Sequence, residues 1–220
     1  MHSTIVLDLE TVPLAESLLA PYPEATRTPP ANYKNEEAIA KWREADRASW
    51  AESRVKECSL NPRLGRIVVF GSSAGMLTAP SEQDEPALLE AAWALIRAAN
   101  GRVVTWNGTF DLRFLLIRSL AHGIRPNLRS EVIRQWFARY HTYPHFDCKS
   151  VLMNWDVKIA GEGLDEWAAF FGLEGKTDGL TGKDVWPLYQ AGDCAAIARY
   201  CEGDVALTQA IYDKIHPYFG

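Results

Sequence analysis

Short apolar segments that alternate with helical periodicity constrain the fold of this 220-residue chain most. Apolar runs at residues 3–9, 66–72 and 103–106 have the length and composition of buried strands. Residues 86–99 and 195–215 instead repeat their apolar side chains every three to four positions, which predicts amphipathic helices. Strands followed by helix, strand and helix are typical of an α/β domain.

A long insertion separates the first two predicted strands. Asp8 and Glu10 are expected to end the first strand, and Thr11-Val12-Pro13 to break it. The Pro- and Thr-rich stretch at residues 20–30 predicts an irregular loop. Residues 36–56 then show helical spacing among many charges. We therefore expect a single domain of residues 1–220 that carries a partly helical arm at about residues 14–57.

The charge of the chain does not exclude nucleic acid as a partner. A formal net charge of −5 differs from the basic surface that such proteins usually have. However, carboxylates that bind cations add negative charge that the bound ions cancel. Basic residues are also concentrated in one stretch, where Glu131 is the single acid. The arginines of that stretch are Arg113, Arg118, Arg125, Arg129, Arg134 and Arg139.

The four cysteines are scattered and form no Cys-x-x-Cys pair. This distribution argues against a zinc ribbon or a disulfide framework and fits a reducing compartment. His141, His145 and Cys148 are spaced closely enough for metal ligands, but no second Cys/His pair accompanies them. The N-terminus has no basic region before a long apolar run, and no stretch approaches the ~20 apolar residues of a membrane span. We expect a cytoplasmic protein that does not enter a membrane.

Carboxylates follow the predicted strands at chemically suggestive positions. Asp8 and Glu10 are two residues apart at a strand end, so their side chains project from the same face. Their mutual repulsion would be removed by a shared cation. Asp111 follows another buried strand at the start of a helix, where the helix dipole alone could also explain an acid. Tyr200 and Asp204 lie one helical turn apart on one face, and together the residues indicate a metal site more strongly than any one alone.

These residues resemble a known family. DLET at 8–11, NGTFD at 107–111 and YCEGD at 200–204 resemble the three motifs of the DEDD superfamily, which includes polymerase proofreading exonucleases, ribonuclease D and oligoribonuclease. The third motif, with tyrosine and no histidine, is similar to the tyrosine branch. The opening DLETVP and the following arm resemble predicted exonucleases related to the proofreading domain of family B DNA polymerases. The resemblance covers residues 4 to about 215.

The resemblance implies a ribonuclease H-like α/β fold, with a mixed five-stranded sheet flanked by helices, and a 3′–5′ exonuclease activity. It implies two divalent cations, Mg²⁺ or Mn²⁺, which prefer carboxylate and water ligands. The implied metal ligands are Asp8, Glu10, Asp111 and Asp204. Asp8 is the best candidate to bridge both ions. Tyr200 would orient the attacking water, because a phenol with a pKa near ~10 is a poor base at neutral pH.

The resemblance also implies contacts to the terminal nucleotide from Thr11, Asn107 and Phe110. Phe110 could stack on a base or pack in the core at the start of its helix. The arginine-rich stretch interleaves positive charge with aromatic rings, as a path for a single strand would, although arginines also lie along helix surfaces without a ligand. The candidates for this path are Arg113, Arg134, Trp136 and Arg139, with Lys176 and Lys183 as weaker ones. The expected partner is the 3′ end of single-stranded DNA or RNA, with DNA favoured.

Two other functions remain as alternatives. Asp8-x-Glu10-Thr11 faintly resembles the Asp-x-Asp-x-Thr opening of haloacid-dehalogenase-like phosphatases, but Glu10 departs from that pattern and Tyr200 and Asp204 stay unexplained. An aspartyl-phosphate intermediate would identify that class. The chain could also be a non-catalytic nucleic-acid-binding module on the same fold, although such a module has no need to keep repelling carboxylates together.

Overall fold

The computed structural model describes residues 4–156, 163–175 and 179–220 and is organised around one mixed sheet of five strands. The order of the strands is β3-β2-β1-β4-β5. β1 pairs antiparallel with β2, and β2 pairs antiparallel with β3, whereas β1–β4 and β4–β5 are parallel. The predicted mixed five-stranded sheet with flanking helices is therefore confirmed. The strands are β1 Ile5–Pro13, β2 Gly65–Ser72, β3 Gly75–Thr78, β4 Val103–Thr105 and β5 His145–Asp147.

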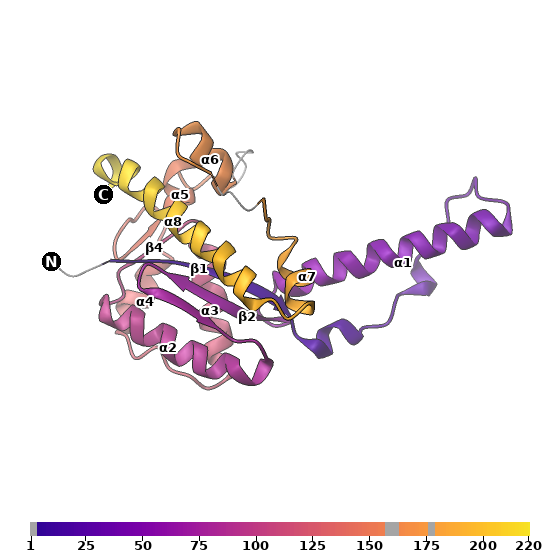
Figure 1. The fold of residues 1–220 in the computed structure, drawn as a ribbon, viewed down its shortest axis with the longest axis horizontal. Coiled ribbons are helices and arrows are strands. Elements are labelled where there is room, and N and C mark those ends of the chain that lie inside the picture. The colour runs from indigo at the N-terminus through magenta and orange to yellow at the C-terminus, as the bar shows by residue number, and fades with distance from the viewer. Residues whose placement is uncertain (1–3, 157–162, 176–178) are drawn as a thin grey trace.

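Helices cover both faces of the sheet. One core cluster joins β1 and β2 to the helices α2, α3 and α4, and two others join the opposite side chains to α5, α6, α7 and α8. Figure 1 shows α8 crossing the sheet over β1 and β2. The helices are α2 Glu85–Ala98, α3 Gly108–Ala121, α4 Ser130–Trp136, α5 Cys148–Leu152, α6 Leu164–Phe170, α7 Val185–Gln190 and α8 Cys194–Phe219; a short 3₁₀ turn, η3 Glu82–Asp84, precedes α2.

The alternation of side chains along β1 decides which way the acids point. Ile5, Leu7 and Leu9 belong to the core cluster under α2 and α3, and Val6 belongs to a cluster on the α8 side. Successive side chains of a strand point to opposite faces, so Asp8 and Glu10 share the side of Val6. Both acids therefore point toward α8.

The prediction that β1 ends at Thr11-Val12-Pro13 is wrong. These three residues continue the ladder with β2, opposite Ile67, Arg66 and Gly65. The irregularity is a shift of register between Glu10 and Thr11, which is the effect of a β-bulge. Pro13 is tolerated because it stands at the very end of the strand, where its missing N–H leaves few ladder bonds unmade.

The segment between β1 and β2 contains a long helix that projects from the sheet (Figure 1). The helix predicted for residues 36–56 is present as α1. Its first turn is capped by Asn35, whose side chain accepts hydrogen bonds from the backbone N–H groups of Glu37 and Ala38, as an N-cap residue does. The elements of the segment are η1 Ala15–Leu19, η2 Glu24–Thr26 and α1 Glu36–Ser59.

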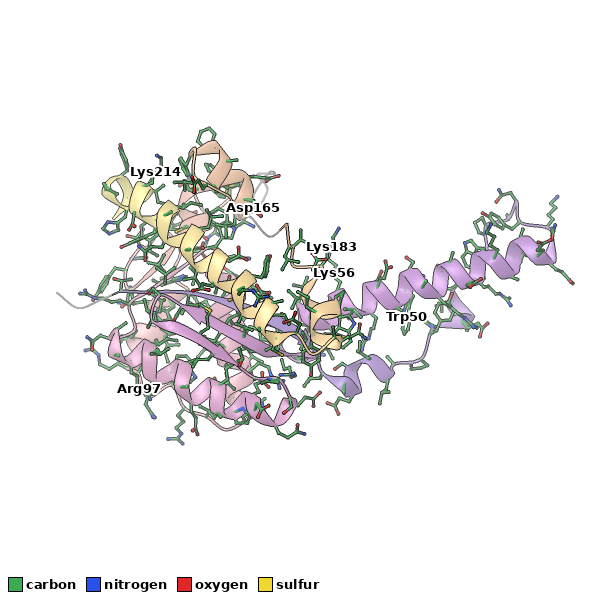
Figure 2. The ribbon with its side chains drawn as sticks, viewed as in Figure 1. Trp50, Lys56, Arg97, Asp165, Lys183 and Lys214 are labelled. Carbon is green, nitrogen blue, oxygen red and sulfur yellow. The ribbon has the colours of Figure 1, made fainter. Side chains whose placement is uncertain are left out.

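The segment that precedes α1 in the chain packs along this helix. The hydroxyl of Tyr22 donates to Asp46, and a guanidinium N–H of Arg27 donates to the same carboxylate at 2.8 Å. The ring of Tyr22 meets the edge of Trp50 with centroids 5.7 Å apart, at the position labelled on α1 in Figure 2. The arm is therefore held together by its own contacts. In the described part of the chain no helix combines the length and apolar character needed to cross a membrane.

Candidate active site

The shortness of β4 opens an edge of β1. The described pairing of these two strands covers only Ile5 with Val103 and Val6 with Val104, while β1 runs on to Pro13. α3 begins at Gly108, soon after β4 ends, and the carboxylate of Asp111 accepts a hydrogen bond from the backbone N–H of Leu9. The backbone of β1 beyond β4 thus receives an acid from the start of α3.

Asp111 is buried, and the negative charges of Asp8 and Asp147 act on its carboxyl group. Its side chain is 3% exposed, and burial, followed by the charges of Asp8 and Asp147, raises its pKa well above the usual range. The backbone N–H groups of Asp111 and Leu9 oppose this rise and are outweighed. A buried carboxylate in such a field favours its neutral form unless positive charge is added.

Helix α8 supplies the next two predicted residues. Tyr200 and Asp204 are both buried on the side that faces the sheet. Burial raises the pKa of Tyr200 far above its ordinary value, and the charges of Asp204, Glu10 and Asp8 raise it further. The hydroxyl also donates a hydrogen bond to Asp204. Tyr200 is therefore a hydrogen-bond donor in this site and not a base.

Cys201 belongs to the same cluster but was not among the predicted site residues. Its Sγ lies 3.4 Å from Oδ2 of Asp8, and one ligand atom each from Asp8, Glu10 and Cys201 lie within 4.8 Å of one another. Burial, then the charges of Asp8 and Glu10, raises the pKa of this thiol well above the usual range. A thiol in that state is not a nucleophile. A single cysteine between two motif residues gives no signal in the sequence.

Asp147 is the second residue that the sequence analysis missed. It ends β5, is buried, and its charge acts on Asp111. Its side chain also caps α5 by accepting from the backbone N–H of Ser150 at 2.7 Å. The signal that pointed to Asp111, an acid directly after a short apolar strand, applies to Asp147 as well.

The donors fit hard cations. Carboxylate oxygens are the protein ligands that Mg²⁺ and Mn²⁺ prefer. The four acids predicted as ligands are Asp8, Glu10, Asp111 and Asp204. The charges of Asp8, Glu10 and Asp204 act on the hydroxyl of Tyr200, and the charge of Asp8 also acts on Asp111. A cation among them would remove the repulsion that raises the pKa of Asp111. The residues present therefore suit a divalent metal.

Comparison with known protein families is decisive here. Residues 71–220 match the model of a family described as predicted 3′–5′ exonucleases related to the exonuclease domain of PolB. The chain belongs to this family. No curated protein matches the chain at a significant level. The resemblance seen in the sequence is thus confirmed, although Asp8 and Glu10 precede the matched residues and are joined to them by the pairing of β1 with β2 and β4.

The histidines near β5 do not form a metal site in this exonuclease-family chain. His145 is buried, with Nδ1 2.8 Å from the carbonyl of Trp136 and Nε2 2.9 Å from Oγ1 of Thr105. Burial lowers the pKa of its imidazole. Among the described residues, His141, His145 and Cys148 do not come together as a group that could bind a metal.

Gly108 → Ala is expected to destabilise the fold by about 1–3 kcal/mol, the usual cost of overpacking. A Cβ at Gly108 would collide with the imidazole of His145 and lie 2.6 Å from Oγ1 of Thr105. Alanine favours a helix by only about 1 kcal/mol over glycine, so the clash dominates. Denaturant unfolding measures the loss. Gly123 → Ala is not a suitable control because of its positive φ, whereas Gly182 → Ala meets nothing within 4 Å and should change stability little.

The predicted contacts to the terminal nucleotide lie beside the carboxylates in the chain. Oγ1 of Thr11 donates to the carbonyl of Ser59 at 2.7 Å, so this hydroxyl fastens the end of α1 to β1. Asn107 precedes α3, and its carbonyl accepts from the backbone N–H of Phe110. The ring of Phe110 is half-buried and tilted against Phe114, with centroids 5.4 Å apart. Core packing against Phe114 therefore explains the buried part of the Phe110 ring.

The candidate strand path needs a correction at Trp136. Its side chain is 3% exposed, its ring stacks on Trp93 at 6.0 Å, and its Nε1 donates to the carbonyl of Gly101. A ring fixed in the core cannot stack on a base, so this prediction is wrong. The arginines Arg113, Arg134 and Arg139 and also Lys183 are exposed, and Lys176 lies outside the described residues.

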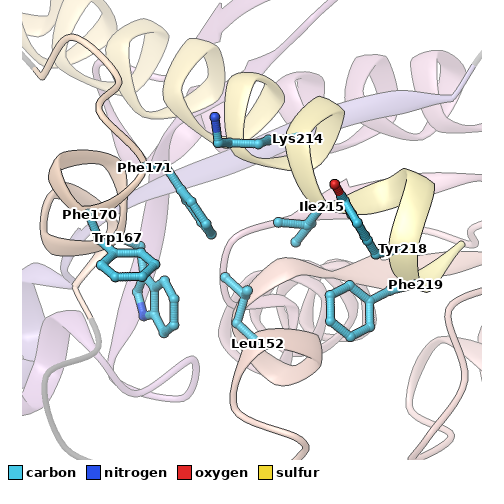
Figure 3. A pocket seen from close by; sticks show the side chains of 8 residues that line it. All are labelled: Leu152, Trp167, Phe170, Phe171, Lys214, Ile215, Tyr218 and Phe219. Atoms are coloured by element: carbon cyan, nitrogen blue, oxygen red, sulfur yellow. The ribbon is translucent and has the colours of Figure 1, made fainter.

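A separate pocket of about 470 Å³ lies between α5, α6 and the end of α8 (Figure 3). None of the predicted site residues lines it. Its walls are aromatic and aliphatic, with the ammonium group of Lys214 at one side. This pocket is therefore distinct from the carboxylate cluster, which is identified by its acidic residues and not by a cavity. The residues of the pocket are Leu152, Trp167, Phe170, Phe171, Lys214, Ile215, Tyr218 and Phe219.

Proposed function

We propose that this protein is a metal-dependent exonuclease that hydrolyses the terminal phosphodiester bond at the 3′ end of single-stranded nucleic acid, with DNA favoured over RNA. The observation that carries the proposal is that acids from β1 and α8 lie near one tyrosine, and that Asp8 of β1 also lies near the buried Asp111 of α3. Membership of a family of predicted 3′–5′ exonucleases supports the reaction class. We also propose one domain, residues 1–220, with the arm at about 14–57 as an insertion.

The proposed cofactors are two divalent cations, Mg²⁺ or Mn²⁺, held by Asp8, Glu10, Asp111 and Asp204. When bound, such ions stabilise charge on the attacking and leaving oxygens of a phosphodiester. Asp8 is the proposed shared ligand, because its side chain lies near both Glu10 and Asp111. The ions held by these acids would in turn position the scissile phosphate.

Tyr200 is proposed to orient the attacking water. Its raised pKa keeps the phenol protonated, so it does not remove a proton from the water. Its single O–H is donated to Asp204, which leaves the phenol oxygen to accept a hydrogen bond from the attacking water. Asp204, one turn later on α8, accepts from that hydroxyl and holds it in place. The role of the tyrosine is therefore positioning.

The terminal nucleotide is proposed to rest against Thr11, Asn107 and Phe110. The half-buried ring of Phe110 retains an accessible part that could touch a base, an interaction worth ~1–3 kcal/mol. The exposed arginines Arg113, Arg134 and Arg139 remain candidates for the strand path through contacts to phosphate.

The test is a shortening assay. The protein is incubated with 5′-labelled single-stranded DNA and RNA of one sequence, with Mn²⁺, Mg²⁺ or chelator, beside Asp8 → Ala and the control Glu202 → Gln. Glu202 lies in the third motif but is exposed. A ladder of 5′-labelled products that needs metal and Asp8 supports the exonuclease, and the faster substrate decides between DNA and RNA. Binding without shortening in folded, metal-loaded protein would favour the non-catalytic module.

Tyr200 → Phe is expected to slow strand shortening by about 10²-fold, the size of effect seen when one positioned hydrogen-bonding group is removed from an active site. Metal binding should be retained, because the four carboxylates stay in place. Single-turnover rates and Mn²⁺ titration measure the two effects. Tyr212 → Phe on the same helix is the control, since the ring of Tyr212 packs on Phe146 away from the acids. Equal losses in both variants would contradict the role of Tyr200.

A further inference from the structure

Cys201 is a thiol held inside the carboxylate cluster. Its Sγ lies 3.4 Å from Oδ2 of Asp8 and 3.7 Å from the backbone oxygen of the same residue. β2 passes directly behind the sulfur, because a Cβ atom added to Gly71 would lie only 2.5 Å from it. The glycine makes room for the thiol, and the two strands fix the sulfur beside Asp8.

The distances suit a single small cation. Zinc lies about 2.3 Å from sulfur and about 2.1 Å from carboxylate oxygen, so two ligands of a tetrahedral ion are about 3.6 Å apart. The separation of 3.4 Å between Sγ of Cys201 and Oδ2 of Asp8 is close to that value. Glu10 completes a set of ligand atoms within 4.8 Å of one another, and water can supply the fourth ligand.

We propose that Asp8, Glu10 and Cys201 form a binding site for a thiophilic divalent cation, Zn²⁺ or Cd²⁺. Sulfur ligands select such soft ions, whereas Mg²⁺ and Mn²⁺ prefer oxygen. A soft ion deprotonates a coordinating thiol outright, and the proton passes to solvent. Asp8 and Glu10 are therefore shared by two classes of metal ion, and the sulfur of Cys201 favours the soft class.

Binding of the soft ion inhibits the nuclease. This consequence rests on the proposed function, because Asp8 and Glu10 are also the proposed ligands of the hard cations. A tetrahedral ion bound by both acids and the sulfur occupies Asp8, which then no longer serves as the shared ligand. Zinc is thus expected to lower Mg²⁺-supported strand shortening.

Cadmium is the direct probe, because a cadmium–thiolate bond absorbs in the near ultraviolet. Chelator-treated full-length protein is titrated with Cd²⁺ as wild type, Cys201 → Ser, Cys194 → Ser and Asp8 → Asn. Cys194 → Ser is the matched control, since Cys194 lies on the same helix and outside the cluster. Wild type and Cys194 → Ser should show absorption that saturates at one ion per chain and is removed by Zn²⁺. Asp8 → Asn should need at least about tenfold more Cd²⁺ to reach half-saturation, which corresponds to a loss of about 1.4 kcal/mol in binding free energy.

Cys201 → Ser should lack the absorption while its far-ultraviolet circular dichroism stays unchanged, and Cys201 → Ala is a second variant if the serine fails to fold. Equal absorption in wild type and in the Cys201 variants, or none in wild type, overturns the inference. The shortening assay is read separately. Strand shortening without a cadmium signal would contradict the soft-metal site and leave the proposed function standing. A cadmium signal without shortening of any substrate would contradict the proposed function and leave the soft-metal site standing.

Discussion

Asp111 → Asn is expected to lower the proposed exonuclease activity by about 10³-fold, equivalent to about 4 kcal/mol of transition-state stabilisation. The substitution keeps the size of the side chain and its oxygen that accepts from the backbone N–H of Leu9. It removes the negative charge needed to hold a cation. The same change should raise the stability of the metal-free protein, because the charge of Asp111 is buried beside Asp8 and Asp147.

The gain in stability has a defined pH dependence. Burial and the neighbouring charges raise the pKa of Asp111 above its value in the unfolded chain, which is about 3.9. A group with a raised pKa contributes stability below the unfolded value and loses it as the pH rises through the folded value. Wild type and Asp111 → Asn should therefore be similar near pH 4, and the variant should be the more stable at neutral pH in chelator.

Denaturant unfolding at several pH values, with chelator and with Mg²⁺, measures this contrast. Mg²⁺ should stabilise the wild type by binding only the folded state and should have little effect on Asp111 → Asn. Glu202 → Gln, an exposed acid in the third motif, is the control and should follow the wild type in every condition. A variant that loses activity and stability together would show that Asp111 serves the fold and not a metal.

Local pattern was sufficient to single out the candidate acids, because each stands at a recognisable place in a strand or a helix. Asp8 and Glu10 needed only the alternation of a strand, and Tyr200 with Asp204 needed only the spacing of one helical turn. The sequence also predicted the mixed sheet through the family resemblance.

Long-range packing accounts for what the sequence left out. Nothing local shows that β4 ends so early that Asp111 reaches the backbone of Leu9. Trp136 was interpreted as a surface ring because it stands among arginines, yet it stacks on Trp93 from a different helix. Cys201 gains meaning only from Asp8 and Gly71, which are remote in the chain.

Arg118 illustrates the same limit and is the site of the second large effect. It was counted with the arginine-rich stretch, but it is buried and its guanidinium lies 2.6 Å from the carboxylate of Glu85. Glu85 also accepts from the backbone N–H of Ile67 at 2.8 Å and lies 2.8 Å from Nε2 of His122. Arg118 thus ties α3 to α2 and, through Glu85, to β2.

Arg118 → Met is expected to lower the free energy of unfolding by about 3–5 kcal/mol, because it leaves a buried charge without its main partner. Denaturant unfolding at neutral pH measures the change. Arg134 → Met is the matched control, because Arg134 and Glu131 also form an ion pair, 3.1 Å apart, but their side chains are 73% and 62% exposed. Such a surface pair contributes about 0–1 kcal/mol, so a similar loss in both variants would contradict the role given to burial.

The pH dependence of this variant should change sign. Burial alone would raise the pKa of Glu85, but the hydrogen bonds from Arg118, Ile67 and His122 and the charge of Arg118 hold it below its usual value. In wild type this group therefore adds stability above the unfolded pKa of about 4.3, and the contribution is lost as the pH falls. Without Arg118, burial dominates, the pKa of Glu85 rises, and stability is lost as the pH increases.

The double variant Glu85 → Gln with Arg118 → Met separates the buried charge from the packing. Glutamine still accepts from the backbone N–H of Ile67, and no ionised group then remains in the core at this position. Because the large penalty belongs to the unpaired charge, the double variant should be more stable at neutral pH than Arg118 → Met alone, with little pH dependence near pH 4–7 from this position. Additive losses from the two substitutions would instead show that shape, and not charge, makes this contact necessary.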